Sequence, residues 1–382
     1  MSNAAPSLEV VVTARPSWAR VKHIVLNYAK LYGEDKVALS LVGPALSTRY
    51  GDLSGQLPKW LQFYRFPSLQ ESDHFESIAL TCLEGANALV RHWSQKRPDC
   101  VLVVADRTET LGVALGAALM QIPLIHLQGG EISGSIDDKV RDTNSKLADL
   151  HLTTNQVTAQ RLIDIGEPNE IIEIVGCPSL DIVNEIRKSS DNSLRNEDLI
   201  GVGNNFSIDQ KFGIIMFHPD TLNELENILW TTALIEMVEK SNLNWFWFWP
   251  NPDHGTNSIS KEIRRSRESG NLQNVKFIIN LPPENFVKLT LKCSLLVGNS
   301  SFGIREASYI GLPVINLGNR QAGRQRAENV LDIANPKMVD QLNDLKIIIN
   351  SKFKSSHIYG SGNSGLLAAQ VIGKWQPRIK KK

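Results

Sequence analysis

The sequence of 382 residues has few cysteines and no apolar run long enough to cross a membrane. The cysteines are Cys82, Cys100, Cys177 and Cys293, and they lie far apart in the chain. None forms a C-x-x-C pair and no histidine cluster has metal-ligand spacing, so the sequence indicates no metal site. We interpret the cysteines as buried thiols of a protein in the reducing cytoplasm. The N-terminus also lacks the charged and apolar regions of a signal peptide.

The sequence also lacks an excess of charge of either sign. It has 41 lysines and arginines against 40 aspartates and glutamates, which gives a formal net charge of +1. Such a balance provides no general attraction to nucleic acid or to a membrane surface, so we expect neither as a partner. The only dense basic stretch is residues 378–382, which we interpret as a solvated tail.

Several common catalytic and cofactor motifs are missing. There is no G-x-x-x-x-G-K-[ST] phosphate loop and no G-x-S-x-G nucleophile elbow. Gly201-Val202-Gly203 lacks a third glycine at dinucleotide-binding spacing, so no nicotinamide cofactor is indicated, and we expect no cofactor at all. The run Trp245-Phe246-Trp247-Phe248-Trp249 has no basic stripe beside it, which favours a core strand over base stacking.

What the sequence does contain is an alternation of short apolar runs and helical patterns. This pattern predicts an α/β fold of two doubly wound, Rossmann-like domains with parallel sheets. The predicted strands lie at residues 8–13, 36–42, 100–105, 123–127, 150–153, 171–175, 212–217, 245–249, 275–279, 294–297 and 313–317. The alternation lapses at about residues 187–210, which are rich in Ser, Asn, Asp and Glu. We therefore predict an N-terminal domain at 1–190, a linker at 191–210, a C-terminal domain at 211–362 and a final helical segment at 363–382.

Residues 294–306 combine a buried strand, a Gly298-Asn299 turn and two serines that open a helix. The free backbone N–H groups and the dipole of such a helix favour an anion, for example a diphosphate. Glu306 follows about one turn later, where it can accept hydrogen bonds from sugar hydroxyls. The alternative is a strand–turn–helix with an ordinary Asn/Ser cap and no ligand, and this stretch alone does not decide between the two.

Polar side chains recur where the other predicted strands end, which is where open α/β sheets bind ligands. They are Arg15, Asp106, Arg107, His126, Glu131, Asp138, His218, Asn251, Asp253, Ser300 and Ser301. Each has an unremarkable alternative: His218 as a hydrogen-bonded loop histidine, for example, or Asp106 as a helix cap. Their shared position at strand ends favours one ligand site.

Longer segments carry a resemblance to a known family. They are Thr13-Ala14-Arg15-Pro16, Asp106-Arg107-Thr108-Glu109, residues 126–138, Gly176-Cys177-Pro178-Ser179, His218-Pro219, residues 249–253, Gly298-Asn299-Ser300-Ser301 and residues 316–324. Together they resemble the hydrolysing UDP-N-acetylglucosamine 2-epimerases of bacterial sialic and legionaminic acid pathways, and the epimerase half of the bifunctional animal enzyme. The resemblance implies a GT-B fold, whose two domains face a cleft and whose C-terminal helix crosses back to the first domain. It also implies a homodimer or a homotetramer.

The sequence departs from the family pattern at two places. Val12-Thr13-Ala14-Arg15 stands where the family usually has Gly-Thr-Arg, and Asp142 stands where it usually has a histidine. The second departure suggests a variant substrate, such as a UDP-2,4-diacetamido sugar. Gln128 stands where the non-hydrolysing branch carries an acidic residue, which points to the hydrolysing branch.

The resemblance implies a reaction in which UDP leaves C1 as the C2 proton is lost, and water then adds to the glycal. Asp106, Glu131 and Asp138 are the candidate acid and base residues, and the sequence leaves their division open. Arg15 and His218 would neutralise the leaving diphosphate. The remaining substrate-binding candidates are Arg107, Asn251, Asp253, Ser300 and Ser301 for UDP and sugar, and Glu306 for the ribose.

Three other functions stay open on the sequence. A GT-B glycosyltransferase would use the same nucleotide site, and a non-hydrolysing epimerase would release no UDP. The third is a UDP-sugar-binding protein without catalytic activity.

Overall fold

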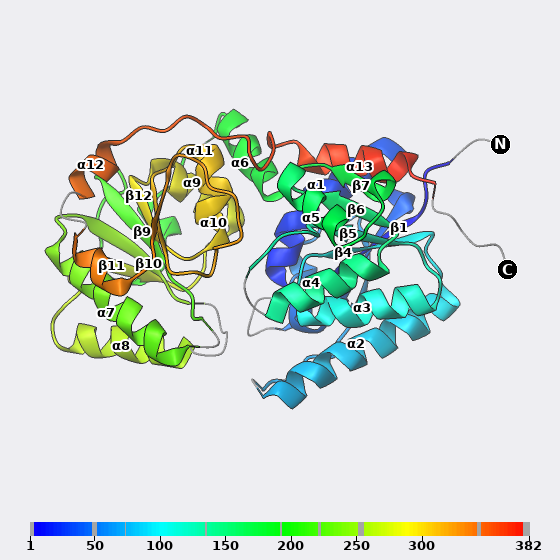
Figure 1. The fold of residues 1–382 in the computed structure, drawn as a ribbon, viewed down its shortest axis with the longest axis horizontal. Helices are drawn as coiled ribbons and strands as arrows, with labels where there is room; N and C mark the ends of the chain where they lie inside the picture. Colours follow the sequence, from blue (N-terminus) through cyan, green and yellow to red (C-terminus); the bar gives the residue numbers. More distant parts are fainter. Residues whose placement is uncertain are drawn as a thin grey trace. The chain divides into compact units, whose positions relative to one another are not determined.

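The computed structural model describes residues 4–47, 52–72, 74–133, 136–191, 193–220, 223–250, 256–341 and 345–376. The chain divides into two compact units (Figure 1). The first comprises Met1–Asp181 and Tyr359–Lys382, and the second comprises Ile182–Ile358. Among the helices within the described ranges, none is long and apolar enough to span a membrane.

The first unit is built on a seven-stranded parallel sheet with the order β3-β2-β1-β4-β5-β6-β7. Its strands are β1 (Leu8–Val12), β2 (Val37–Val42), β3 (Gln62–Phe66), β4 (Cys100–Val104), β5 (Leu124–Leu127), β6 (Leu150–Thr153) and β7 (Ile172–Ile174). Its helices are α1 (Arg15–Tyr32), α2 (Phe75–Gln95), α3 (Thr108–Leu119), α4 (Ile136–Leu147), α5 (Gln156–Asp164) and α13 (Ser364–Lys374), and α6 (Ser179–Lys188) leads into the second unit. The strand order reverses between β1 and β4, which makes their carboxyl ends the topological switch point of a doubly wound sheet.

Helices cover both faces of this sheet, and β1 shows how the sequence achieves it. Leu8, Val10 and Val12 pack into one core with residues of α1 and α13. Val11 points to the opposite face and packs into a second core with residues of α2 and α3. A strand that is buried on both faces favours apolar residues at successive positions, as in residues 10–12, and the buried Glu9 is compensated by hydrogen bonds from the Ser40 hydroxyl and Trp93 Nε1.

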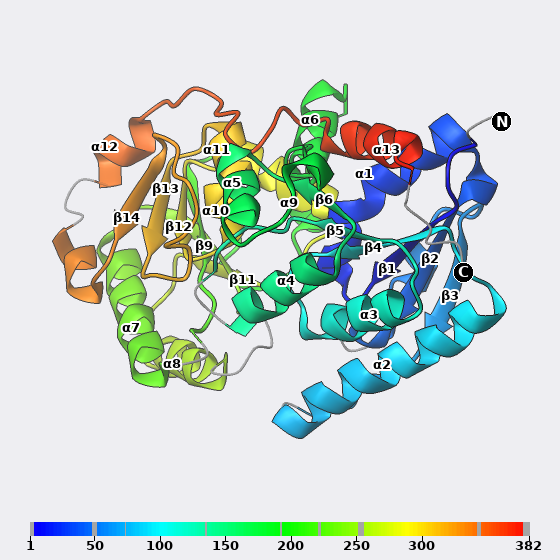
Figure 2. The ribbon, with the colours of Figure 1, turned by 45° about the vertical axis from the view of Figure 1, so that its right-hand side comes forward.

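The C-terminal helix α13 belongs to the first unit, as predicted. It lies beside α1 in both ribbon views (Figures 1 and 2), and Ala368, Ala369 and Ile372 are buried in the core that α1 shares. The Asp181 carboxylate accepts hydrogen bonds from the backbone N–H groups of Ser364 (2.9 Å) and Gly365 (2.6 Å). A carboxylate at this position satisfies the first free N–H groups of α13 and interacts favourably with its dipole.

The second unit contains another seven-stranded sheet, with the order β14-β13-β12-β9-β10-β11-β8. Its strands are β8 (Val202–Gly203), β9 (Phe212–Met216), β10 (Asn244–Phe248), β11 (Val275–Ile278), β12 (Leu295–Gly298), β13 (Val314–Leu317) and β14 (Val330–Ile333). Only β8 runs antiparallel among the pairings described. Its helices are α7 (Glu224–Lys240), α8 (Thr256–Glu268), α9 (Pro283–Lys292), α10 (Ser301–Ile304), α11 (Glu306–Ile310) and α12 (Leu345–Asn350). Here the switch point lies between β9 and β12.

The aromatic run on β10 is a core strand, which confirms our interpretation of it. Trp245 and Trp247 are fully buried in one core of the second unit, whereas Phe246 and Phe248 pack into the core on the other face of the sheet. Alternate side chains of a strand point to opposite faces, so both faces of β10 are filled by rings.

The division between the units differs from the predicted boundary at residue 190 and the predicted linker at 191–210. The chain passes from one unit to the other within α6, and residues 191–210 belong to the second unit. Leu194, Leu199 and Ile208 are buried in its core beside Phe212. Isolated apolar residues in a polar stretch produce no periodicity, so the sequence pattern resembled a linker although these side chains anchor the segment.

We predict that Gly365→Ala destabilises the first unit. A Cβ atom at this position would lie 2.6 Å from the Cβ and 2.7 Å from the backbone carbonyl carbon of His23, so α1 and α13 would have to separate. We expect the free energy of unfolding to fall by about 1–3 kcal/mol in urea denaturation. Leu367→Ala, on the exposed side of the same helix, is the control and should change it by less than about 0.5 kcal/mol. Equal stability of Gly365→Ala and the wild type would contradict this close packing.

Candidate active site

The turn after β4 carries Asp106 and is held from two sides. Ala105 adopts a left-handed conformation (φ 55°), which is uncommon for a residue with a Cβ atom. Its carbonyl oxygen lies 2.9 Å from Nε2 of His126 on β5 and accepts a hydrogen bond from Asn144 Nδ2 on α4 (3.3 Å). These contacts fix the backbone immediately before Asp106.

His126 is a neutral member of this arrangement. Its Nε2 faces a carbonyl oxygen, which can only accept, so Nε2 carries the ring proton and Nδ1 accepts from the Ser145 hydroxyl at 3.0 Å. Complete burial lowers the pKa of His126 to about 3. The imidazole is therefore uncharged at neutral pH and serves as a fixed hydrogen-bonding group.

The loop after β5 carries Glu131 and depends on two unusual backbone conformations. Gln128 has φ 65°, and Gly130 has φ 79°. A Cβ atom at Gly130 would lie 2.1 Å from the carbonyl oxygen of Thr158, so only glycine fits against α5 here. Glu131, which follows, is buried, and its carboxylate lies 3.5 Å from the Thr154 hydroxyl.

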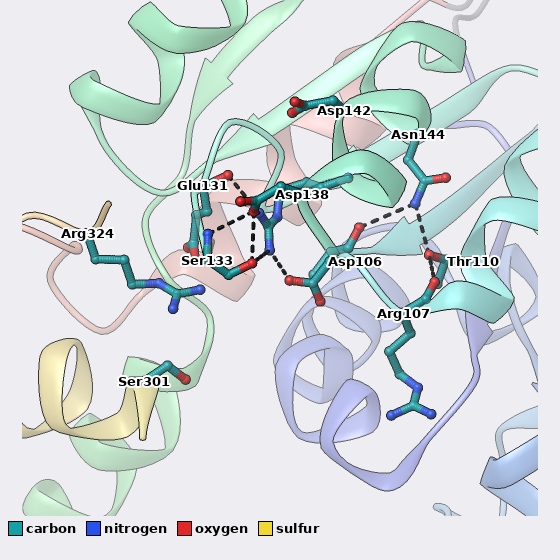
Figure 3. Close-up of polar contacts among 12 residues, drawn as sticks. Asp106, Arg107, Thr110, Glu131, Ser133, Asp138, Asp142, Asn144, Ser301 and Arg324 are labelled. Carbon is teal, nitrogen blue, oxygen red and sulfur yellow. Dashed lines mark hydrogen bonds and ion pairs between the residues drawn. The ribbon is translucent and has the colours of Figure 1, made fainter. Parts of the chain in front are cut away.

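Arg141 of α4 connects these loops through what we call the Arg141 cluster: Asp106, Glu131, Ser133, Asp138 and Arg141. The guanidinium is fully buried and forms ion pairs with the carboxylates of Asp106 and Asp138. It also donates to the backbone oxygen of Glu131 (2.7 Å) and to the Ser133 hydroxyl (3.3 Å). The Ser133 N–H and hydroxyl in turn donate to Asp138 at 2.8 Å each. Figure 3 shows Asp106, Glu131, Ser133 and Asp138 side by side.

The electrostatics of this cluster are dominated by its carboxylates. Burial alone would lower the pKa of Arg141, but the nearby Asp106, Glu131 and Asp138 outweigh burial and raise it above its ordinary value. The guanidinium therefore stays charged although it is out of contact with water. The structure thus brings together the three predicted acid and base candidates.

The two other cations predicted in the first unit have different surroundings. Arg15 is half-buried at the first position of α1, directly after the β1 strand. Arg107 precedes α3 and donates from Nε and Nη2 to the buried Glu109 carboxylate at 3.0 and 2.9 Å. This pairing balances the charge of Arg107.

In the second unit, His218 follows β9 and is clamped by Asn299, which follows β12. The Asn299 Oδ1 accepts from the His218 N–H and its Nδ2 donates to the His218 carbonyl, both at 2.8 Å. Burial, reinforced by Arg320, lowers the pKa of His218 to about 3. Burial disfavours the charged form of the imidazole, so the cationic role expected for His218 is not supported in the free protein at neutral pH.

Ser300 caps a short helix that begins at Ser301, because α10 ends at Ile304 and α11 begins at Glu306. The Ser300 hydroxyl caps α10 by accepting from the Phe302 N–H (3.3 Å), and the Ser301 hydroxyl accepts from Arg305 Nη2 (3.0 Å). Glu306 is buried, with Oε2 3.8 Å from Arg305 Nε. Both alternatives for this stretch include such a cap, so diphosphate binding here stays a prediction.

Asn251 and Asp253 lie outside the described residues. The sequence assigned no role to Arg141, although its position three residues after Asp138 places the two on one helix face. It likewise assigned none to Arg320 and Gln321, which donate to the Asn299 carbonyl at 3.4 and 2.9 Å. Within the described ranges, no group of three or more His, Cys, Asp or Glu side chains has the geometry to hold a metal ion.

Comparisons with known proteins agree on one family. Residues 53–373 match the family described as UDP-N-acetylglucosamine 2-epimerase. A hydrolysing UDP-N,N'-diacetylbacillosamine 2-epimerase of Legionella pneumophila is 32% identical over 282 residues, which cover 73% of this chain and 72% of that protein. A UDP-N-acetylglucosamine 2-epimerase of Neisseria meningitidis is 34% identical over 236 residues, 61% of this chain and 59% of that one.

Solved structures show the same fold at lower identity. The UDP-GlcNAc 2-epimerase from Neisseria meningitidis, bound to UDP-GlcNAc, superimposes with a TM-score of 0.76 at 17% identity, covering 96% of this chain and 99% of that one. The Methanocaldococcus jannaschii enzyme gives a TM-score of 0.77 at 16% identity, with the same coverage. These likenesses confirm the predicted GT-B-type fold of two parallel-sheet α/β domains. With the match over most of its length and a relative above 30% identity, the chain belongs to the UDP-N-acetylglucosamine 2-epimerase family.

Proposed function

We propose that this protein is a hydrolysing UDP-sugar 2-epimerase. Its substrate would be UDP-N-acetylglucosamine or a 2,4-diacetamido analogue, and its products UDP and a free N-acetylmannosamine-type sugar. The observation that carries the proposal is the Arg141 cluster, in which one guanidinium pairs with the Asp106 and Asp138 carboxylates and binds the backbone carbonyl of Glu131. The hydrolysing Legionella relative and Gln128, in place of the acidic residue of the non-hydrolysing branch, support this branch of the family.

In the first step, a carboxylate takes the proton from C2 of the sugar while the C1–O bond breaks. The C2–H electron pair forms the C1=C2 double bond of a glycal, and the pair of the breaking bond leaves with UDP. The proton on C2, the carbon that bears the acetamido group, is only weakly acidic, so departure of the diphosphate must run ahead of proton removal. Asp106, Glu131 and Asp138 are the carboxylates proposed for this proton transfer.

In the second step, water adds to the glycal. Its hydroxyl bonds to C1, and a proton returns to C2 on the face opposite to the one that lost it. Epimerisation therefore needs an acid and a base on different sides of the sugar, and one carboxylate cannot serve both faces. A cluster of three carboxyl groups from the β4–α3 turn, the β5–α4 loop and α4 can supply both groups.

Each unit contributes candidate residues for binding UDP. Arg15 would contribute a positive charge to the diphosphate, and Arg107 would contact the substrate once it separates from Glu109. His218 would act as a neutral hydrogen-bond donor instead of a cation, since its pKa is about 3. Ser300 and Ser301 would bind the diphosphate through hydroxyl and amide groups, Glu306 would accept from the ribose, and Asn251 and Asp253 remain candidates for the sugar or ribose.

The choice between the two sugars is linked to Asp142. This residue, which replaces the usual family histidine, forms a two-bond ion pair with Arg161 (2.8 Å each), and Arg161 also donates to the Glu131 carbonyl at 3.3 Å. Asp142 is thus linked through Arg161 to the loop that carries Glu131, so an aspartate in place of the histidine can alter the sugar pocket.

We expect turnover of UDP-N-acetylglucosamine or its 4-acetamido analogue without any added acceptor. In D₂O, NMR should show stoichiometric UDP and a free sugar of inverted configuration with deuterium at C2, because the returning proton comes from solvent. Conversion of the nucleotide sugar without UDP release would indicate the non-hydrolysing reaction. UDP release only with an acceptor would indicate a glycosyltransferase, and binding without turnover of either sugar would indicate a binding protein.

We further expect Glu131→Gln and Asp138→Asn to reduce kcat by roughly 10²-fold or more, because general acid–base catalysis typically contributes 10²–10⁴-fold. Affinity for UDP, measured by calorimetry, should change little if both groups act on the sugar. Asp164→Asn, an exposed carboxylate on α5 of the same unit, is the matched control and should retain wild-type kcat. Wild-type turnover by both site variants would refute the assignment.

We also propose that the protein forms a homo-oligomer through α2 and α3. Large apolar side chains on these neighbouring helices are exposed: Phe75 (86%), Leu83 (61%), Leu115 (46%) and Leu119 (77%). Monomeric proteins rarely expose an apolar surface of this kind, and a second copy of the same surface is a chemically matched partner.

Light scattering coupled to size-exclusion chromatography should therefore report the mass of a dimer or a tetramer. The double substitution Leu83→Asp with Leu119→Glu should reduce it to the monomer mass, because charges cannot be buried unpaired in an apolar interface. Leu225→Glu, an equally exposed position on α7, should leave the mass unchanged. A wild-type monomer, or a double variant of unchanged mass, would contradict the proposed surface.

A further inference from the structure

Arg141 differs from the other charged groups of the proposed site because no part of it is accessible. Its side chain is 1% exposed, whereas those of Asp106 and Asp138 are each 21% exposed. A group so placed cannot contact a substrate directly. Its effect on the reaction must pass through the residues that it touches.

Those residues come from three separate segments of the first unit. Asp106 lies in the β4–α3 turn, the Glu131 carbonyl and Ser133 lie in the β5–α4 loop, and Asp138 lies one turn before Arg141 on α4. The planar guanidinium directs one nitrogen toward Asp138 and the other toward Asp106. A fork of this shape fixes the distance between two carboxylates, which the single ammonium of a lysine cannot do.

The charge of Arg141 also controls how many protons the cluster holds. Asp106, Glu131 and Asp138 surround one guanidinium, so full ionisation would leave an excess of negative charge in a largely buried place. His126 faces the cluster from β5 but is neutral, and Arg161 is paired with Asp142. A guanidinium at this position favours ionised carboxylates, whereas the like charges of the three carboxylates disfavour full ionisation. A base and an acid within one cluster require that some of its carboxyl groups are ionised and others protonated.

We propose that Arg141 is the positioning residue of this epimerase, which aligns Asp106 and Asp138 and keeps enough of the cluster ionised to provide a base beside an acid. The proposal rests on the hydrolysing-epimerase function inferred above. It assigns the alignment of the carboxylates to a residue that itself never touches the sugar.

Arg141→Lys tests the alignment, because lysine keeps the charge but loses the fork. We expect kcat for the UDP-sugar that the wild type converts to fall roughly 10²-fold, since small misplacements of catalytic groups have effects of this size. KM and the affinity for UDP, measured by calorimetry, should stay within about threefold. Arg65→Lys is the matched control, because Arg65 is an exposed arginine of the same unit that pairs with Asp52 at 3.0 Å. It should show wild-type values.

Arg141→Gln tests the charge. Loss of the cation raises the pKa of the remaining carboxyl groups, so the base is protonated up to a higher pH. The acidic limb of the kcat–pH profile should accordingly move to higher pH than in the wild type, a shift that general destabilisation would not produce. Carbon-13 NMR titration of the Asp and Glu carboxyl groups should show the same upward shift without any need for turnover.

Wild-type kcat in Arg141→Lys, or an unchanged acidic limb and unchanged carboxyl titration in Arg141→Gln, would overturn the proposal. So would a loss of UDP affinity in Arg141→Lys equal to its loss of kcat. If Arg141→Gln does not fold, the split between kcat and UDP affinity in Arg141→Lys decides. If the wild type converts neither UDP-sugar, the proposed function is refuted. The NMR titration of the carboxyl groups then still measures the effect of Arg141 on their ionisation.

Discussion

A buried cation surrounded by carboxylates is the interaction on which the first unit's site depends. Removing a guanidinium from water costs several kcal/mol unless well-placed partners compensate, and Arg141 has such partners on three segments. The compensation works in both directions, since the carboxylates keep Arg141 charged and Arg141 holds them in place. The ion pairs that offset the cost of burying the Arg141 guanidinium therefore also bring together the groups proposed to act on the sugar.

Neutral hydrogen bonds support this charged centre. His126, uncharged because it is buried, donates a hydrogen bond to the carbonyl oxygen of Ala105. The left-handed backbone conformation of Ala105 sets the direction in which the chain continues to Asp106. The second unit uses the same kind of support, since the Asn299 amide clamps the backbone of His218. In both units the residues proposed to face the ligand follow strands next to the switch point of the sheet, and side chains from neighbouring elements fix their backbone.

Much of the fold could be predicted because buried parallel strands are apolar along their whole length. The central strands of both sheets, the core role of the aromatic strand β10 and the return of α13 to the first unit are all confirmed. The sequence did not predict the edge strands β3, β8 and β14, in which Ile333 of β14 is the one buried residue. Nor did it place residues 191–210 in the second unit, since a few isolated leucines and isoleucines generate no periodic signal.

The sequence by itself determined the family, the α/β class and the positions of Asp106, Glu131, Asp138 and His218 after strands, because local patterns and motifs encode these features. Only the tertiary structure decided which residues contact one another and which charges they carry. It showed that Arg141 is the centre of the carboxylate cluster and that His218 is buried, which lowers its pKa. Both findings depend on burial and on contacts with residues distant in the chain, and local sequence patterns reveal neither.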